Sequence, residues 1–527
     1  MRRGFFWMPL LVLFVLGVVL SVRPARPAPP PEVSAYGASL VELLPDSTLV
    51  AVDLAGLGQR WHEIEERPAL KGFVERVSEG LGVPVRDLLR LAGDRVVVGI
   101  FSAAGERSWT PIAVVRPPTV ADALALRALL GASRSSLVVR RGRGVLWLGP
   151  ASHSQLVTDV AEGDGTSVVD HLAIDAVAHW LPAGGLVRGW IHVDALRDAL
   201  RSHSAHVPPG WVELLWAGAI AELEAVRFAG FRRDLTDEGV VTDFAAGYDL
   251  ASLPPELSAA FAAPPTAPAL AAAPPPGTVA ACSFRPEAGM WLPWMRFVAA
   301  NDRQGPFRNI DFWMREFEER SGARLQDDLF ALLGERAWLF ITRAAPGEEL
   351  QVAVIVDTSD AARVERTLLL LRAWYAELTL GCSLGFVIPL ADDSPGQGAV
   401  IHELQWWTPL GRLPGPAFAV APGYLVVGSG KEAVARGLET IAKPGFAPLD
   451  RASGQASRAH VAFTGRGEML ASLVGLLEAG HFLPGDHPVA EALRGLGAEI
   501  DGITGRVWYE ENVVRLQATV GCAKLAH

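Results

Sequence analysis

Two segments of the chain, about 240 residues apart, carry the same order of sequence features. Each begins with a turn that leads into a short apolar strand, Pro45-Asp46-Ser47-Thr48 in the first copy and Pro276-Gly277-Thr278 in the second. An amphipathic helical stretch, two β-rich runs, another helix and a further strand follow in both copies. An internal duplication of one structural unit therefore constrains the fold more than any other feature.

Corresponding residues of the two copies predict where helices begin and end. Gly93 and Gly334 each stand between an apolar helical run and a β-rich run, so each is expected to cap the end of a helix. Thr119 in the first copy, and Ser359 or Asp360 in the second, precede the next predicted helix. Short polar side chains are favoured at such N-cap positions.

The apolar, uncharged run at residues 4–22 follows Arg2 and Arg3 and is long enough to cross a bilayer as a helix. We expect a single uncleaved anchor in the cytoplasmic (inner) membrane, with the large domain on the periplasmic or extracytoplasmic side. A cleaved signal peptide, which would release a secreted protein, is the alternative. Residues 24–31 are rich in proline and predict a stiff spacer after this run.

The order of helices and strands predicts an α+β fold with largely antiparallel sheets, in which consecutive strands are often neighbours. With 527 residues, the chain is long enough for two or more domains. Residues 262–276 are almost entirely alanine and proline, which indicates a linker. The predicted domains are an anchor and Pro-rich spacer (1–32), a first α+β repeat (33–261), the linker (262–276) and a second α+β repeat (277–527).

Composition excludes two classes of protein. Half of the residues are hydrophobic and 20% are charged, which excludes a disordered chain. A net charge of −11 argues against a nucleic-acid binder, whose affinity comes mainly from basic residues. Cys282, Cys382 and Cys522 are too few and too scattered for a disulfide scaffold or a closed zinc site, although one bridge between Cys282 and Cys522 stays open.

Catalytic signatures are incomplete in this sequence. The residues 381–385 fit the G-x-S-x-G turn that exposes a nucleophilic serine, here Ser383. That turn should connect a strand to a helix, whereas here a helical segment precedes it and a strand-like run follows. We therefore expect the end of a helix, no enzyme activity, no cofactor and no metal site. A serine hydrolase stays the alternative, with Asp392 as the acid and His402, His460 or His487 as the base.

Tryptophan is the least ordinary part of the composition, with 16 residues. Four of them form two close groups, Trp291 with Trp294 and Trp406 with Trp407. Tryptophan favours places where one side is apolar and the other is wet, such as ligand clefts and partner interfaces. These four are our candidate ligand-binding residues, and ordinary core packing is the alternative interpretation.

The Pro45-Asp46-Ser47-Thr48 turn, the Leu91-Ala92-Gly93-Asp94 helix end and the N-terminal apolar run together resemble a bacterial family, the domain of unknown function 3352 family. The resemblance is best over residues 43–115. It implies an uncharacterised envelope protein and no known activity, so it assigns no catalytic residue.

The leading functional hypothesis is a non-enzymatic envelope protein, held in the membrane by its N-terminal helix, whose two repeats form a binding or scaffolding module for a protein partner. A carrier of a hydrophobic ligand, such as a lipid or a lipidated partner, is the second hypothesis. The serine hydrolase is the third.

Overall fold

The computed structural model describes residues 40–54, 78, 83–93, 96–102, 109–132, 137–142, 144–163, 166–182, 184–203, 211–236, 239–262, 274–284, 291–301, 309–343, 350–380, 386–393, 399–408, 411–413, 415–443, 446, 461–466 and 500–522. The predicted anchor, its spacer and most of the predicted linker lie outside these ranges. Among the residues within them, no helix is both long enough and apolar enough to cross a membrane.

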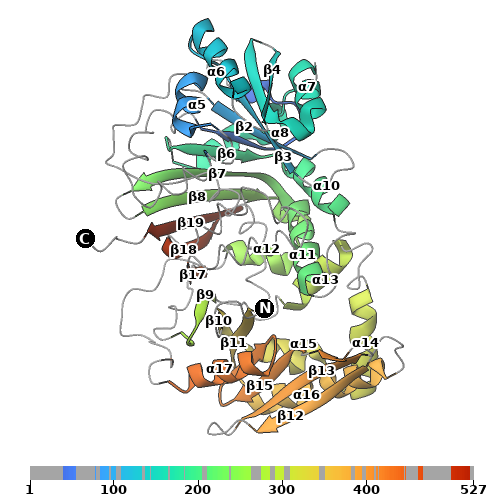
Figure 1. Cartoon of the computed structure of the whole chain (residues 1–527). Helices are drawn as coiled ribbons and strands as arrows, with labels where there is room; N and C mark the ends of the chain where they lie inside the picture. The colour runs from blue at the N-terminus through green and yellow to red at the C-terminus, as the bar shows by residue number, and fades with distance from the viewer. Residues whose placement is uncertain are drawn as a thin grey trace, which may run out of the picture. The chain divides into compact units, whose positions relative to one another are not determined.

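The described chain forms two compact units of helices and antiparallel sheet, which confirms the predicted α+β class (Figure 1). The N-terminal unit contains described residues from 40–249, 466, 500–505 and 512–522. The C-terminal unit contains described residues from 250–465 and 506–511. The division therefore falls after Asp249, ahead of the predicted linker, and it assigns the last described strand to the N-terminal unit.

The N-terminal unit mixes helices with pairs of consecutive strands. Its elements are η2 (Leu40–Leu43), β1 (Thr48–Asp53), α5 (Val85–Ala92), β2 (Val96–Ser102), β3 (Trp109–Val115), α6 (Val120–Ala132), β4 (Leu137–Gly142), β5 (Val145–Pro150), η3 (Ala151–His153), α7 (Ser154–Glu162), α8 (Val169–Leu172), α9 (Ile174–Trp180), β6 (Val187–Ile191), α10 (Val193–His203), α11 (Trp211–Ala225), β7 (Val226–Thr236), β8 (Gly239–Tyr248) and β19 (Val513–Cys522).

The C-terminal unit has a similar mixture of elements. They are η5 (Leu250–Ser252), α12 (Pro255–Ala262), β9 (Thr278–Phe284), α13 (Trp291–Asn301), α14 (Ile310–Ser321), α15 (Leu325–Asp328), η7 (Phe330–Leu332), β10 (Leu333–Thr342), β11 (Gln351–Thr358), α16 (Ala361–Thr379), β12 (Phe386–Asp393), β13 (Val400–Thr408), β14 (Gly411–Leu413), β15 (Ala417–Ala421), β16 (Tyr424–Gly428), α17 (Lys431–Ile441) and β17 (Val461–Gly465). The unit boundary at residue 505 falls within β18 (Ile500–Glu510).

Strand pairing follows one pattern in both units. In the N-terminal unit the order across the sheet is β4-β5-β3-β2-β1-β6-β7-β8-β19, and every pair is antiparallel. In the C-terminal unit it is β12-β13-β15-β16-β11-β10-β9-β17, also antiparallel, with β14 paired to β13. In each unit the first strand lies between the second strand and a strand that comes much later in the chain.

Helices cover both faces of the sheet in the N-terminal unit. One face buries Trp147 and Trp190 against η2, α7, α8 and α9. The other face packs Val96 and Leu148 against Leu89 of α5 and Leu126 of α6. Strands buried on both sides require continuous apolar runs, and the Val-Val-Val-Gly-Ile-Phe sequence of β2 is such a run.

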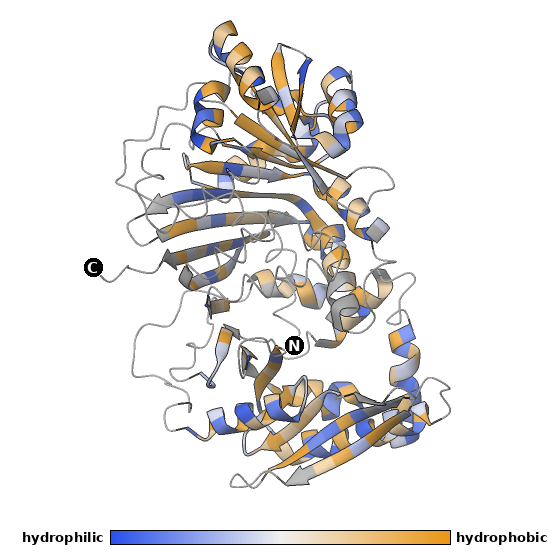
Figure 2. Cartoon of the chain, viewed as in Figure 1, coloured by the Kyte–Doolittle hydropathy of each residue, from blue (hydrophilic) through white to orange (hydrophobic). Residues whose placement is uncertain are grey.

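The C-terminal unit is also covered on both faces. Val434 and Leu438 of α17 pack on the face that carries Ile401, Phe340 and Ile355. Successive residues of a strand point to opposite faces, so His402 points away from the face that carries Ile401. The long helix α16 lies on this opposite face, where its Arg372 contacts His402. Figure 2 shows that α14 and α16 both carry apolar and polar residues, as expected for helices with one face toward the solvent.

Two predicted N-caps are confirmed. The backbone N–H of Asp122 donates to the Thr119 hydroxyl at 3.1 Å at the start of α6. At the start of α16, the backbone N–H of Arg363 donates to the Asp360 carboxylate at 3.0 Å. In both cases a short polar side chain satisfies an N–H group that the first helical turn leaves without a partner.

The two predicted glycine caps had different outcomes. Gly93 ends α5 with a φ of +86° and donates its N–H to the carbonyl of Leu89, as predicted. The prediction for Gly334 was wrong, because this residue lies inside β10 rather than at a helix end. Its lack of a side chain serves close packing instead, since a Cβ atom here would lie 2.3 Å from the carboxylate of Asp357. That carboxylate accepts two hydrogen bonds from Arg336, both of 2.9 Å.

Candidate functional site

The four candidate tryptophans lie on two elements of the C-terminal unit. Trp291 and Trp294 belong to α13, and Trp406 and Trp407 belong to β13. Of their side chains, the structure describes only Trp407, which is half-buried. A cleft built from all four tryptophans therefore stays a prediction.

The hydrolase candidates are only partly described. Ser383, His460 and His487 lie outside the described residues, and a serine nucleophile stays untested. His402 lies on β13, where the strand register places Ala391 of β12 opposite it, while Asp392 stands opposite Ile401. The strand register therefore does not place the predicted acid, Asp392, directly opposite the predicted base, His402.

His402 contacts two charged side chains of α16. Its Nδ1 lies 2.8 Å from a guanidinium nitrogen of Arg372, and its Nε2 lies 3.8 Å from a carboxylate oxygen of Glu365. Its ring also packs against Phe418 of β15, with 5.0 Å between centroids. Because a guanidinium only donates hydrogen bonds, Nδ1 is the acceptor and the neutral ring carries its proton on Nε2, toward Glu365.

The surroundings of His402 favour the neutral imidazole. Burial lowers its pKa, the positive charge of Arg372 lowers it further, and Glu365 opposes both effects. Burial also lowers the pKa of Arg372, whose guanidinium makes a second hydrogen bond to the carbonyl of Leu390 at 3.1 Å. His402, Arg372 and Glu365 thus join α16 to β12 and β13. Because only 6% of His402 is exposed, little of its surface is open to a substrate.

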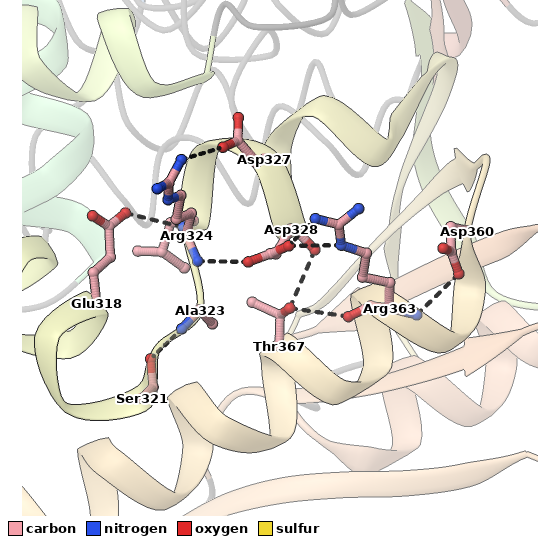
Figure 3. A network of polar contacts seen from close by, with 10 residues as sticks. Glu318, Ser321, Ala323, Arg324, Asp327, Asp328, Asp360, Arg363 and Thr367 are labelled. Atoms are coloured by element: carbon pink, nitrogen blue, oxygen red, sulfur yellow. Dashed lines mark hydrogen bonds and ion pairs between the residues drawn. The ribbon is translucent and has the colours of Figure 1, made fainter.

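A second polar network joins α14, α15 and α16, and Figure 3 shows it. The Asp328 carboxylate accepts from the backbone N–H of Arg324 at 2.6 Å and from Nε of Arg363 at 2.6 Å. The hydroxyl of Thr367 donates to the carbonyl of Asp328 at 3.2 Å, and Glu318 accepts from the backbone N–H of Leu325 at 3.0 Å. These contacts fix the orientation of the three helices.

The same network determines the protonation of Asp328. The hydrogen bond from the Arg324 backbone lowers the pKa of its carboxyl group, and the hydrogen bond and positive charge of Arg363 act in the same direction. Desolvation opposes them without reversing the result. Asp328 is therefore a stable anion at neutral pH, and it holds α15 to α16 by charge as well as by hydrogen bonds.

The surface beside these helices exposes large apolar side chains. Phe312 (52% exposed) and Trp313 belong to α14, and Leu378 and Leu380 (68% exposed) stand at the C-terminal end of α16. Trp374 of α16 connects the two helices, because its ring contacts Trp313 at a centroid distance of 6.3 Å. We call Phe312, Trp313, Trp374, Leu378 and Leu380 the α14–α16 patch.

The patch follows from how α14 packs. Met314 and Phe317 are buried, and Phe317 contacts the Trp374 ring at 5.7 Å, so this stripe of α14 faces α16. Phe312 and Trp313 stand one or two positions before that stripe, and their rings contact each other at 5.0 Å on the outer side. Arg320 and Glu377 reinforce the helix pair with an ion pair of 3.8 Å.

Sequence reasoning about tryptophan did not find this patch. The signal was present in α14, where Phe312 and Trp313 precede a buried Met-x-x-Phe stripe, but it required knowing which helix lies beside it. Among the other described residues, Val120 and Leu124 of α6 are also exposed large apolar side chains, and Leu390 of β12 is another.

Two further observations bear on metal and thiol chemistry. Among the described residues, no group of three or more His, Cys, Asp or Glu side chains is placed to hold a metal ion. Cys282 of β9 is a free thiol, and burial raises its pKa to about 12, so it stays protonated. Cys382 and the side chain of Cys522 lie outside the described part of the chain.

Comparisons of the chain with protein-family models, with curated proteins and with solved structures found no match.

Proposed function

We propose that this protein is a non-enzymatic binding or scaffolding module of the bacterial envelope, and that the α14–α16 patch is where it binds a protein partner. The exposed aromatic and leucine side chains of the patch are the observation that carries this proposal. Exposed large apolar side chains that gather on neighbouring helices are costly in a soluble unit and are typical of interaction sites. Tryptophan and phenylalanine are also enriched in the buried centre of protein interfaces.

The location rests on the sequence. The apolar run at residues 4–22 supports a single anchor in the inner membrane, with both units on the extracytoplasmic side. The resemblance of the Pro45 turn and the Leu91 helix end to the domain of unknown function 3352 family agrees with an envelope protein. A cleaved, secreted form is the alternative location.

A duplication of one ancestral unit is part of the proposal, and the shared strand order supports it. The turn before the first strand also supports it: Thr48 donates its hydroxyl to the carbonyl of Pro45 at 2.7 Å, and Thr278 donates to Pro275 at 2.6 Å. This pairing aligns Pro45 with Pro275. Duplicated units give a binding protein two related surfaces that can diverge separately.

Partner chemistry follows from the composition of the patch. Its centre is apolar and aromatic, and Arg315 and Arg320 of α14 lie on its exposed margin beside Glu319. A protein segment with apolar residues at its centre and mixed charges around them would match this surface. The lipid carrier and the serine hydrolase stay as sequence-based alternatives, since their named residues lie mostly outside what the structure describes.

Site-specific photo-crosslinking in cells tests the proposal. A benzoylphenylalanine residue at position 312 or 378 should give a discrete protein adduct of the full chain in its native membrane. The same residue at position 120 or 124, equally apolar and exposed on α6, is the matched control and should give none. Equal yields from both pairs, or no adduct from the patch, would contradict a binding role for it.

Protease protection separately tests the location. In spheroplasts, added protease should digest both units of the full chain while leaving a cytoplasmic marker intact. Protection of the units until the membrane is broken would place them in the cytoplasm and would overturn the envelope assignment.

A further inference from the structure

The turn that precedes β1 is held from two sides. Thr48 closes the turn by donating its backbone N–H to the carbonyl of Pro45 at 3.0 Å. Asp46 joins the turn to the segment before α8, because its N–H donates to the Thr166 carbonyl at 3.0 Å and its carboxylate accepts from the Thr166 hydroxyl at 2.8 Å. The N–H of Val168 donates to the Leu44 carbonyl at 2.9 Å and extends this contact.

Two histidines meet at the same turn. His192 follows β6 and is only 7% exposed, and its Nδ1 donates to the backbone carbonyl of Asp46 at 2.9 Å. The exposed His171 of α8 stacks on it, with 4.5 Å between ring centroids and 18° between ring planes. Since a carbonyl can only accept, Nδ1 carries the proton of neutral His192, and acid must add the second proton at Nε2.

On balance, the surroundings of His192 oppose its protonation. Burial lowers its pKa, and the nearby His171 lowers it further. Asp194 of α10 and the carbonyls of Asp46 and Thr48 act in the other direction, but their sum is smaller. A stack of two imidazoles is therefore stable while at least one ring is neutral, and it becomes repulsive when both are charged.

We propose that the His171–His192 stack is an acid-sensitive latch, which holds α8 against the Pro45–Thr48 turn at neutral pH and releases it in acid. Asp194 offsets only part of a positive charge on the stack, because its carboxylate is already paired with Arg197 of α10 at 2.9 Å. Release would loosen the hydrogen bonds between Asp46 and Thr166. In the extracytoplasmic location proposed above, the latch would be exposed to the pH outside the cytoplasm.

Hydrogen–deuterium exchange of the full-length chain at pH 7.5 and pH 5.5, corrected for intrinsic exchange rates, tests the latch. The wild type should lose protection about tenfold at acid pH in the peptides that cover residues 44–52 and 166–172. A peptide over residues 351–358 in the other unit should not change. His171→Gln removes one of the two charges at an exposed position, so its loss should be under about threefold.

Two variants make the test specific. His179→Gln, at another exposed histidine of the same unit, should behave as the wild type. His192→Asn keeps a side-chain donor for the Asp46 carbonyl but cannot be protonated, so its protection should not depend on pH. An equal acid response in the wild type and His171→Gln would overturn the proposal. So would a response that persists in His192→Asn, a loss shared by residues 351–358, or no loss at pH 5.5.

Discussion

Arg232 of β7 and Asp243 of β8 lie directly opposite each other and form an ion pair of 3.1 Å with side chains only 13% and 9% exposed. Arg188 of β6 stands opposite Arg232, and Gln517 of β19 stands opposite Asp243. The amide of Gln517 donates to the Asp243 carboxylate at 3.0 Å from 274 residues away. One polar row thus fixes the register of four strands and holds the last strand to the N-terminal unit.

Removing Asp243 should destabilise the N-terminal unit, because the mostly buried Arg232 would keep only Asp234 as a carboxylate partner and Gln517 would lose its acceptor. We expect Asp243→Ala to lower the free energy of unfolding by about 2 kcal/mol in urea denaturation of the full chain. Asp311→Ala is the matched control, since it breaks the exposed ion pair with Arg296 and should cost less than about 1 kcal/mol. Similar costs for the two variants would show that the buried row does not carry this stability.

His402 should make the stability of the C-terminal unit sensitive to mild acid. Its pKa in the folded chain is lowered by burial and by Arg372. The unfolded chain therefore takes up this proton first, so the contribution of His402 is complete above the unfolded pKa and is lost as pH falls below about 6.5.

Urea unfolding at pH 8 and pH 5 should show this loss in the wild type. His402→Gln, which can still accept from Arg372 but cannot be protonated, should lose less stability between the two pH values. His179→Gln in the other unit should leave the wild-type dependence in place. If the variant at position 402 kept the full wild-type pH dependence of stability, His402 would be excluded as its source.

Asp328 should act in the same sense as His402, but at lower pH. Its folded pKa is lowered, first by the Arg324 backbone and then by Arg363, so its contribution is present above the unfolded pKa near 3.8 and is lost as pH falls through the folded value. Asp328→Asn should therefore be less stable than the wild type at pH 7. The difference should shrink as pH falls toward 3. A constant difference over this range would mean that shape rather than charge explains the effect.

Local features were the part of the fold that the sequence predicted well. The N-caps at Thr119 and Asp360 and the cap at Gly93 depend on residues within a few positions, and all three were found. Gly334 was misplaced because its local pattern resembles a helix end. The reason for the glycine is Asp357, 23 positions later and on the neighbouring strand.

Long-range pairing was the part that the sequence could not predict. Nothing near Gln517 indicates that its partner is Asp243, because an alternating strand is compatible with many neighbours. The α14–α16 patch was missed for the same reason, since exposure of Phe312 is a property of how two helices pack. His402 was a candidate from its chemistry, but its contact with Arg372 depends on α16 lying across β13.

The mass of the complex formed in the native membrane tests the central claim most directly. Full-length chain would be extracted in mild detergent, and its native mass compared with that of Phe312→Ser/Leu378→Ser and of Val120→Ser/Leu124→Ser. We predict a discrete complex heavier than the chain alone for the wild type and for the α6 variant, and the mass of the chain alone for the patch variant. A complex that survives the patch substitutions, with unfolding otherwise unchanged, would contradict the assignment of the α14–α16 patch as the binding surface.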